Sequence, residues 1–291
     1  MARHDKDIWL VVGGDGLIGR ALVARAKGEG RAVLATTRRC KEAGPSRPFL
    51  ELAQDPASWS LPGPVSVAFL LAAAANQASC CADPAVSRRI NVDHTVALAQ
   101  RLVGQGAFVV FTSTNLVFDG ELAGYPTCAS PSPTSEYGRQ KAEAERQLQA
   151  LGNSVAVVRL TKVLSADMPL IGGWVENLRN GKPIEAFTDL VCAPMPVGFV
   201  VEALMRIGAA GRGGLFHLSG ADEVTYADLA RSLARRLGAE RDLVRPVTSA
   251  EAGIKLQAIP KHSSLDAEAV ATAFDLPPPR LAEVIEACVR R

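Results

Sequence analysis

The chain has 291 residues and a formal net charge of +2, from 32 basic and 30 acidic side chains. This length allows one large α/β domain and a smaller appended one, with a core that needs neither disulfides nor metals. The balanced charge, without a Lys/Arg tract interleaved with aromatic residues, argues against a nucleic-acid surface and favours a small-molecule substrate.

The sequence shows neither a targeting segment nor a metal-binding motif. Residues 1–7 are charged and lack the apolar stretch of a secretory signal, and the longest apolar runs, such as 65–75, are too short to cross a bilayer. The six cysteines form no CxxC pair and have no histidine at metal-ligand spacing. We therefore expect a cytoplasmic protein with free thiols, no metal and no membrane partner.

The first half of the chain alternates short apolar runs with helical patterns, which is typical of βαβ units in a parallel sheet. The strands are expected to be apolar on both sides because helices cover both faces of such a sheet. Predicted strands are 8–12, 32–36, 65–71, 108–112 and 155–160, and predicted helices are 17–26, about 84–103 and about 135–151. The sequence thus predicts a doubly wound α/β fold.

The first predicted strand runs directly into a GxxGxxG pattern that opens a helix. In this pattern Gly13 permits the turn, Gly16 lets a pyrophosphate approach the backbone, and Gly19 allows close packing of helix and strand. The first helical turn, Leu17 and Ile18, then presents free N–H groups and the positive end of the helix dipole to the phosphates. A glycine triplet alone is weak, but this context predicts a dinucleotide site.

The second predicted strand ends at Arg38 and Arg39, where NAD-dependent enzymes of this fold often carry an acidic residue for the ribose 2′-hydroxyl. A guanidinium there would pair with a 2′-phosphate, so NADP is the favoured cofactor and NAD the less favoured one. The alternative is that both arginines only solvate a loop. Further expected cofactor contacts are Glu51, Leu52, Ala72 and Ala73.

Tyr137 and Lys141 stand four residues apart at the start of a helical pattern and so share one face. A nearby fixed cation favours the phenolate, so we expect Lys141 to lower the pKa of Tyr137 and to suit it to proton transfer. The sequence Ser113-Thr114 follows a central strand, at the sheet edge where ligands bind. Thr114 is therefore predicted to hydrogen-bond the reacting oxygen, with Ser113 supporting it.

After residue 160 the alternation gives way to Pro- and Gly-containing stretches around 168–173, 181–183 and 194–196, which predict loops. A strand at 215–218 and a helix at 226–237 follow. Thr225 and Asp228 have the spacing of a capping box, and Gly238 is placed to end that helix. A last helix is predicted from the apolar stripe that begins at Leu281.

These residues give the chain a family resemblance. It resembles the extended short-chain dehydrogenase/reductases, and among them the dTDP-4-dehydrorhamnose reductase branch of nucleotide-sugar enzymes. The matching positions run in order along nearly the whole chain: 13–19, 91–92, 113–114, 117–120, Tyr137, Lys141, Glu145, Arg159, 216–220 and 264–266. The resemblance implies that Thr114, Tyr137 and Lys141 form a catalytic triad, that Lys141 also binds the nicotinamide ribose, and that Asn91 holds the helix or a water near Lys141.

Two departures concern the substrate. The branch usually has Asp-Tyr after the catalytic threonine, whereas this chain has Asn115-Leu116, and the acids that carry elimination in the related dehydratases are missing. Aromatic residues expected after Arg159 are replaced by a segment containing Lys162, which either faces an anionic group of the substrate or is a solvated lysine. Ser113, Asn115, Lys162 and Trp174 are the candidate substrate contacts.

We expect an NADP-binding domain at 1–165, rejoined by about 183–218, and a smaller substrate-binding part at 166–182 and 219–291. The predicted reaction is hydride transfer between NADPH and a nucleotide-activated 4-keto sugar. Two alternatives stay open: a nucleotide-sugar epimerase, which would usually retain NAD, and a non-catalytic NADP-binding regulator such as the related methionine adenosyltransferase regulatory subunits. A homodimer is a further expectation for this fold.

Overall fold

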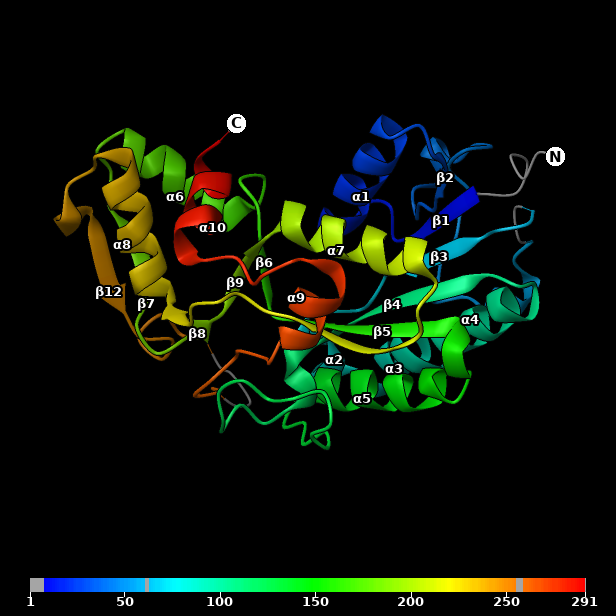
Figure 1. Cartoon of the computed structure of the whole chain (residues 1–291). Helices are drawn as coiled ribbons and strands as arrows, with labels where there is room; N and C mark the ends of the chain where they lie inside the picture. Colours follow the sequence, from blue (N-terminus) through cyan, green and yellow to red (C-terminus); the bar gives the residue numbers. More distant parts are fainter. Residues whose placement is uncertain (1–7, 61–62, 255–258, 291) are drawn as a thin grey trace. The chain divides into compact units, whose positions relative to one another are not determined.

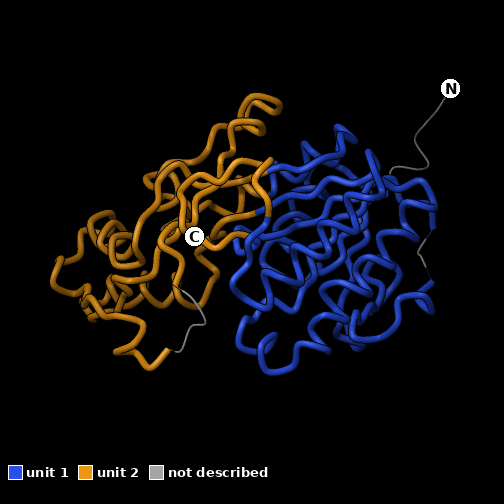
Figure 2. Tube along the Cα trace, turned by 90° about the horizontal axis from the view of Figure 1, so that it is seen from below, with its two compact units in different colours: residues 1–117, 131–159, 201–216 blue, residues 118–130, 160–200, 217–291 orange. Residues whose placement is uncertain are grey.

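The computed structural model describes residues 8–60, 63–254 and 259–290. The charged residues 1–7, on which the expectation of no signal peptide depends, lie outside the described residues. Within the described parts, no helix is long and apolar enough to cross a membrane. Figure 2 colours two compact units, of which the first comprises residues 1–117, 131–159 and 201–216 and the second 118–130, 160–200 and 217–291.

The first unit is built on a sheet whose strand order, over the described residues, is β10-β5-β4-β3-β1-β2. The pairs β1–β2, β1–β3 and β3–β4 are parallel. This order confirms the predicted doubly wound fold. The strands of this sheet are β1 (Ile8–Val12), β2 (Ala32–Ala35), β3 (Val67–Leu70), β4 (Phe108–Thr114), β5 (Val155–Leu160) and β10 (Gly214–Leu218).

Helices lie on both faces of this sheet, as Figure 1 shows. On one face α4 contacts β3 and β4, and α5 contacts β4. On the other α1 contacts β1 and β2, and α7 approaches so closely that only the glycine Gly208 fits against the Phe69 ring. The helices are α1 (Leu17–Gly28), α2 (Gln77–Ala82), α3 (Pro84–Arg88), α4 (Thr95–Gly104), α5 (Glu136–Gln149) and α7 (Val197–Ala210).

The core of the first unit consists of the apolar strand residues and the inner faces of these helices. Leu10, Ala68, Leu98 and Val109 are all 0% exposed and belong to one cluster. The continuous apolar runs of the sequence therefore mark strands that are buried on both sides. The predicted helix 84–103 is divided, because residues Arg89–His94 form a π-helical turn between α3 and α4.

The second unit has its own core, made by α6, α8 and α10 around Ile171, Trp174, Leu229, Leu233 and Ile285. Its helices are α6 (Pro169–Arg179), α8 (Tyr226–Leu237), α9 (Glu268–Phe274) and α10 (Leu281–Val289). Its strands are β6 (Lys162–Leu164), β7 (Ile184–Phe187), β8 (Val191–Cys192), β9 (Pro194–Pro196), β11 (Val224–Thr225) and β12 (Val244–Val247). They pair as β6–β9, β7–β12 and β8–β11.

Both ends of α8 have the capping residues that the sequence predicted. Thr225 accepts a hydrogen bond from the Asp228 amide at its N-terminus, and Gly238 adopts φ +68° just past its C-terminus. Two other expectations for the second half are wrong. The loop predicted around 168–173 is the start of α6, where Pro169 occupies the first turn, a position that requires no N–H donor. The loop at 194–196 is strand β9.

The domain boundaries also differ from the sequence-based ones. Residues 118–130 belong to the second unit although 1–165 was expected to be continuous, and the segment that rejoins the first unit is 201–216 rather than about 183–218. The second unit correspondingly takes 160–200 and 217–291. Local patterns could not locate these boundaries because they depend on contacts between segments far apart in the sequence.

Candidate active site

The glycine loop between β1 and α1 is held by close backbone contacts. Gly13 has φ +94°, and a Cβ atom at Gly19 would lie 2.2 Å from the Gly13 carbonyl oxygen. Gly16 precedes α1, and no side chain caps the helix there. The first N–H groups of α1 therefore have no side-chain acceptor and suit an anion. These observations fit the pyrophosphate role that the spacing predicted.

A cleft of about 180 Å³ opens beside this loop in the first unit. It contains seven of the residues predicted to contact the cofactor: Gly13, Gly16, Arg38, Glu51, Leu52, Ala72 and Ala73. It also contains residues that the sequence did not single out, among them Asp15, Thr36, Leu50, Ala74 and Ile90. The predicted residues Leu17, Ile18, Gly19, Arg39, Asn91 and Lys141 do not line it.

The end of β2 distinguishes the two arginines. Arg38 lines the cleft. Arg39 instead points to Glu42, with 3.0 Å between Nη1 and Oε1, and its side chain is 62% exposed. Arg38 therefore lies at the cleft, whereas the short helical turn after β2 supplies Arg39 with a partner of its own.

Helix α5 begins against the turn that follows β4. A Cβ atom at Gly138 would lie 2.1 Å from the Leu116 carbonyl oxygen. The backbone of α5 at Gly138, the residue after Tyr137, therefore touches the backbone of the turn after β4. Ser135 caps the helix by accepting a hydrogen bond from the Gly138 amide at 3.1 Å. One turn later, Lys141 Nζ donates to the Thr112 carbonyl at 2.7 Å. The structure thus brings the predicted tyrosine and lysine to the end of β4.

The electrostatics of this pair differ from the sequence-based prediction. Burial raises the pKa of Tyr137 to about 12, with a smaller contribution from the Cys80 thiol. Burial lowers the pKa of Lys141 to about 7, against the opposing attraction of the Glu145 carboxylate. The expected lowering of the Tyr137 pKa by Lys141 is not found: Lys141 Nζ donates to the Thr112 carbonyl and lies 3.8 Å from the centre of the Phe111 ring, and loss of water is the main cause of the shift at Tyr137.

The hydroxyls at the end of β4 are buried. Thr114 Oγ1 accepts a hydrogen bond from the Leu116 amide at 3.2 Å and lies 3.5 Å from Asn115 Oδ1. Ser113 Oγ has no hydrogen-bond partner among the described residues, although it is enclosed. Since buried hydroxyls are normally satisfied, Ser113 has hydrogen-bonding capacity left for a bound molecule.

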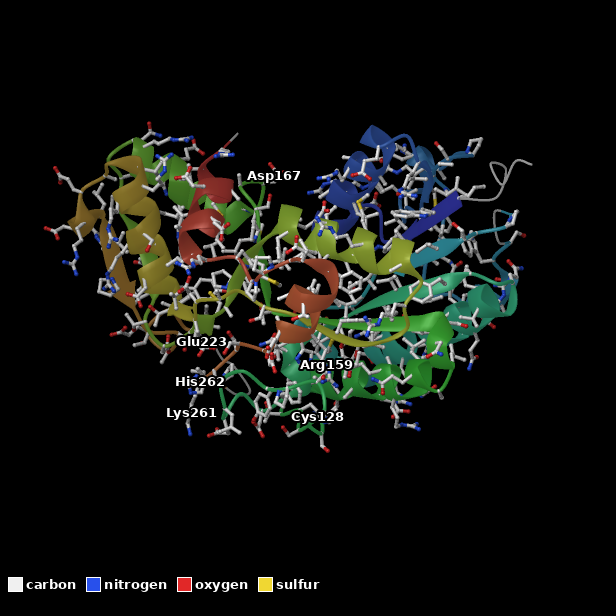
Figure 3. All side chains as sticks on the ribbon, in the orientation of Figure 1. Cys128, Arg159, Asp167, Glu223, Lys261 and His262 are labelled. Carbon is white, nitrogen blue, oxygen red and sulfur yellow. The ribbon has the colours of Figure 1, made fainter. Side chains whose placement is uncertain are left out.

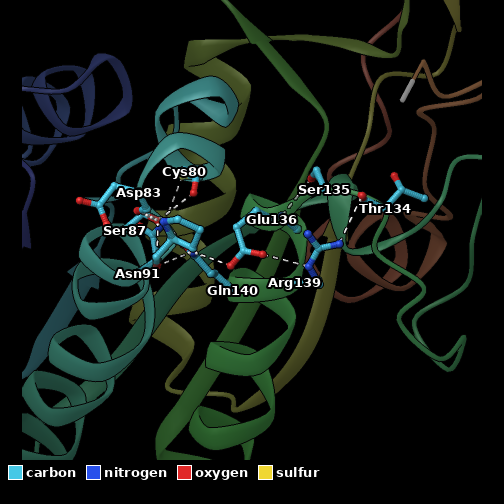
Figure 4. A network of polar contacts seen from close by, with 11 residues as sticks. Cys80, Asp83, Ser87, Asn91, Thr134, Ser135, Glu136, Arg139 and Gln140 are labelled. Carbon is cyan, nitrogen blue, oxygen red and sulfur yellow. Dashed lines mark hydrogen bonds and ion pairs between the residues drawn. The ribbon is translucent and has the colours of Figure 1, made fainter. Parts of the chain in front are cut away.

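Asn91 lies in the π-helical turn and links α5 to Ala74, a residue that lines the cleft; Figure 4 shows Asn91 in the polar network with Gln140. Its amide oxygen accepts from the Ala74 N–H at 2.8 Å, and its Nδ2 donates to the Ala74 carbonyl at 3.0 Å and to Gln140 Oε1 at 2.9 Å. Gln140 Nε2 in turn donates to Ser87 Oγ and Glu136 Oε1, both at 2.9 Å. Asn91 therefore tethers α5 through Gln140, the residue before Lys141, in the way that the resemblance implied, although nothing in the sequence pointed to Gln140 as its partner.

The candidate substrate residues of the second unit have varied surroundings. Lys162 Nζ lies 5.8 Å from the centre of the Tyr226 ring, and Trp174 is only 6% exposed and packs edge-on against the same ring. Another lysine of this unit, Lys261, which Figure 3 labels beside His262, pairs with Glu121 at 2.5 Å. Trp174 is thus mainly a core residue, whereas Lys162 makes no ion pair among the described residues.

A family model matches nearly the whole length of the chain. The model of the RmlD substrate binding domain matches residues 8–291. The chain belongs to the RmlD substrate binding domain family. The match begins at the first residue of β1 and so includes the glycine loop, the end of β4 and α5 of this RmlD-family protein.

Individual relatives of the RmlD-family protein are reductases by name. It is 28% identical over 194 residues to a Haloferax volcanii protein named "Probable low-salt glycan biosynthesis reductase Agl14", a match that spans 64% of each chain. It is 29% identical over 254 residues to the dTDP-4-keto-6-deoxy-D-glucose reductase of Streptomyces niveus, covering 84% of this chain and 83% of that one.

Solved structures confirm the fold. The dTDP-4-dehydrorhamnose reductase of Bacillus anthracis, crystallised in complex with NADP, superposes with a TM-score of 0.83 at 18% identity and covers 98% of both chains. At this identity the likeness concerns the arrangement of helices and strands. The glycine loop and the Tyr137 helix of this chain thus belong to a fold that, in that relative, accommodates a dinucleotide.

Proposed function

We propose that this protein is an NADP-dependent reductase that transfers hydride to a nucleotide-activated 4-keto sugar. The observation that carries the proposal is that α5, which bears Tyr137 and Lys141, packs against the end of β4: its Gly138 touches the Leu116 carbonyl and its Lys141 donates to the Thr112 carbonyl, beside Ser113 and Thr114 in the chain. Relatives named as keto-sugar reductases support the substrate class. A protein that only binds a dinucleotide does not require this group of residues.

The residues of the first unit fit a dinucleotide. The uncapped start of α1 suits the pyrophosphate, and the cleft residues Leu50, Leu52 and Ile90 offer an apolar surface to an adenine ring. Arg38 supplies a positive charge where the adenosine ribose lies in this fold. When bound, the nicotinamide would supply the hydride.

The chain's own residues would handle the proton. Tyr137 keeps its proton at neutral pH because burial raises its pKa to about 12, so it is prepared to donate to the more basic alkoxide that forms as a carbonyl is reduced. Thr114 and Ser113 would hydrogen-bond the same oxygen and stabilise its developing charge. A protonated phenol favours the direction of reduction over that of oxidation.

The direct test is to incubate purified protein with NADPH and a dTDP-4-keto-6-deoxy sugar and to follow the loss of NADPH together with the sugar product. Net, stoichiometric consumption of NADPH is expected. Isomerisation of the sugar without net consumption would identify an epimerase and reject the reductase. No turnover with dTDP-, UDP- or GDP-linked keto sugars, despite tight NADPH binding, would favour the regulatory alternative.

Tyr137→Phe tests the mechanism because it removes only the phenolic proton. We expect turnover to fall by about a hundredfold or more, which is the usual contribution of a general acid, while NADPH affinity stays within about twofold. Calorimetry gives the affinity and steady-state kinetics give the turnover. Tyr125→Phe, a second phenol in the described chain that donates to Asp119 at 2.5 Å, is the matched control. Equal loss in both variants, or none in Tyr137→Phe, would discard the assigned role.

A further inference from the structure

A row of alternating charges extends from the glycine loop to the segment that follows β2. Arg47 Nη2 donates to Asp15 Oδ1 at 2.5 Å, and its Nη1 lies 2.8 Å from Glu42 Oε2. Glu42 also pairs with Arg39 at 3.0 Å. Asp15 thus stands at one end of a row of four charged side chains, and this end is the one that lines the cleft.

Hydrogen bonds fix Asp15 against the end of β2. Thr37 Oγ1 donates to Asp15 Oδ2 at 2.9 Å, and the backbone amide of Arg38 points at the same oxygen at 3.4 Å. In dinucleotide folds the adenosine ribose lies at this position, where a carboxylate binds the 2′-hydroxyl or an arginine binds the 2′-phosphate. Here the Asp15 carboxylate pairs with the Arg47 guanidinium beside the Arg38 backbone, and Arg38 lines the same cleft.

We propose that Arg47 reads the 2′-phosphate of NADP together with Arg38, and that Asp15 competes with the phosphate for the Arg47 guanidinium. The inference rests on the proposed function, since it assumes that the cleft binds a dinucleotide. It assigns cofactor preference to two residues that lie outside the arginine pair at the end of β2.

The charge balance supports this assignment. The cluster contains the carboxylates of Asp15 and Glu42 and the guanidiniums of Arg38, Arg39 and Arg47, so an excess positive charge is left for an anion. Arg38 makes no ion pair within the described part of the chain, and it lines the cleft. A phosphate between Arg38 and Arg47 would meet an Arg38 guanidinium that makes no ion pair among the described residues and an Arg47 guanidinium that also pairs with Asp15 and Glu42.

The exchange of partners at Arg47 is feasible because its pair with Asp15 is partly solvated. The Arg47 side chain is 39% exposed and that of Asp15 is 23% exposed, so water weakens their attraction. A phosphate can accept two parallel hydrogen bonds from one guanidinium and so replace the carboxylate. While Asp15 is paired with Arg47, hydrogen bonds from Arg47 and Thr37 outweigh burial and hold the pKa of its carboxyl below the usual range, so a negative charge stands beside the place of the phosphate. It therefore repels the phosphate.

The test compares two fragments of the cofactor that differ only in the 2′-phosphate. Full-length wild type, Arg47→Gln and Asp15→Asn are titrated with 2′,5′-ADP and with 5′-AMP by calorimetry at constant ionic strength. Arg47→Gln is expected to weaken 2′,5′-ADP by about tenfold, as for the loss of one charge-assisted hydrogen bond, and to leave 5′-AMP within about twofold. Asp15→Asn is expected to tighten 2′,5′-ADP by about threefold or more.

Arg25→Gln is the matched control, because Arg25 is an exposed arginine of the same unit that pairs with Glu29 and Glu202 away from the cleft. It should bind both fragments like wild type. Unchanged 2′,5′-ADP affinity in Arg47→Gln, or weaker binding in Asp15→Asn, would overturn the inference while the dinucleotide site stands. Failure of wild type to bind either fragment or NADPH would overturn the proposed function and this inference together.

Discussion

Lys141 is a cation kept inside the first unit at a cost in stability. Its side chain is buried, its Nζ reaches a backbone carbonyl, and burial lowers its pKa to about 7. The unfolded chain exposes this lysine to water, where it holds its proton to much higher pH. Such a placement favours a functional role for Lys141 over a structural one.

Lys141→Met is therefore expected to stabilise the protein while abolishing turnover. Between about pH 7 and the ordinary pKa of lysine, the unfolded chain binds more protons than the folded one, so wild-type stability rises with pH. The gain of the variant over wild type should be largest at about pH 7 and below and should shrink toward about pH 10. Urea unfolding across this pH range measures it.

The exposed Lys182 provides the control for this comparison. Lys182→Met should follow the wild-type dependence of unfolding free energy on pH. If Lys141→Met were less stable than wild type at about pH 7, the interactions of the ammonium with Thr112 and Phe111 would outweigh its desolvation, and the assigned origin of the low pKa would be incorrect.

Helix α5 is positioned by a direct backbone contact and by a side-chain link. Gly138 allows the helix to touch the Leu116 carbonyl, and the Asn91–Gln140 link holds its second turn. Tyr137 and Lys141 lie on either side of these two contacts. The position of the helix is therefore the element-level determinant of the candidate site.

Gly138→Ala should displace α5, because the added carbon would lie 2.1 Å from a backbone oxygen that cannot move alone. We expect the free energy of unfolding to fall by about 1–3 kcal/mol, as for overpacked cores, and turnover to fall further than NADPH affinity. Gly104→Ala is the control, since no heavy atom lies within 4 Å of its added carbon. Wild-type stability and turnover in Gly138→Ala would contradict the packing.

The sequence predicted elements well where one pattern dominated. Each strand of the first half is a compact apolar run, and the glycine loop has only one spatial solution. It failed at α6, where Met168-Pro169 and two glycines suggested a loop although burial of Ile171 and Trp174 stabilises a helix. The π-helical turn was equally hidden, because hydrogen bonds from Asn91 to residues 17 and 49 positions away have no local signature.

The site shows the same division. The identities of Tyr137, Lys141 and Thr114 followed from spacing and resemblance, but their pKa values depend on burial, which a sequence does not contain. Asp15 and Arg47 were missed because they meet across 32 residues of chain. A sequence does not contain the long-range contacts that place one charged side chain beside another.

At the level of the whole molecule, the chain leaves the first unit after residue 117 and again after 159, and returns at 131 and 201. One segment of the first unit, residues 201–216, therefore comes from the C-terminal half of the chain. Within residues 201–210 of α7, Gly208 packs against the Phe69 ring. The Phe69 ring is tilted against the Trp9 ring, with 5.2 Å between the ring centres. Without residues 201–210, Phe69 and Val67 of β3 would lose a packing partner.

A fragment of residues 1–160 should consequently fail to form a cooperative core even though it contains β1 to β5. We expect Trp9 fluorescence to report a solvated indole and urea unfolding to lose its sigmoidal shape. The full chain, in which Trp9 is 1% exposed, is the reference. A fragment with native-like near-ultraviolet dichroism and a sharp transition would show that α7 and β10 are dispensable.

The ion pair between Arg159 and Glu145 joins β5 to α5 at 2.7 Å, and both side chains are 3% exposed. Losing either partner alone strands a charge in a place without water, which is far more harmful than replacing both with apolar groups. A change at either position alone should therefore lower the free energy of unfolding more than a joint change of both to apolar residues, which urea unfolding of the three variants measures.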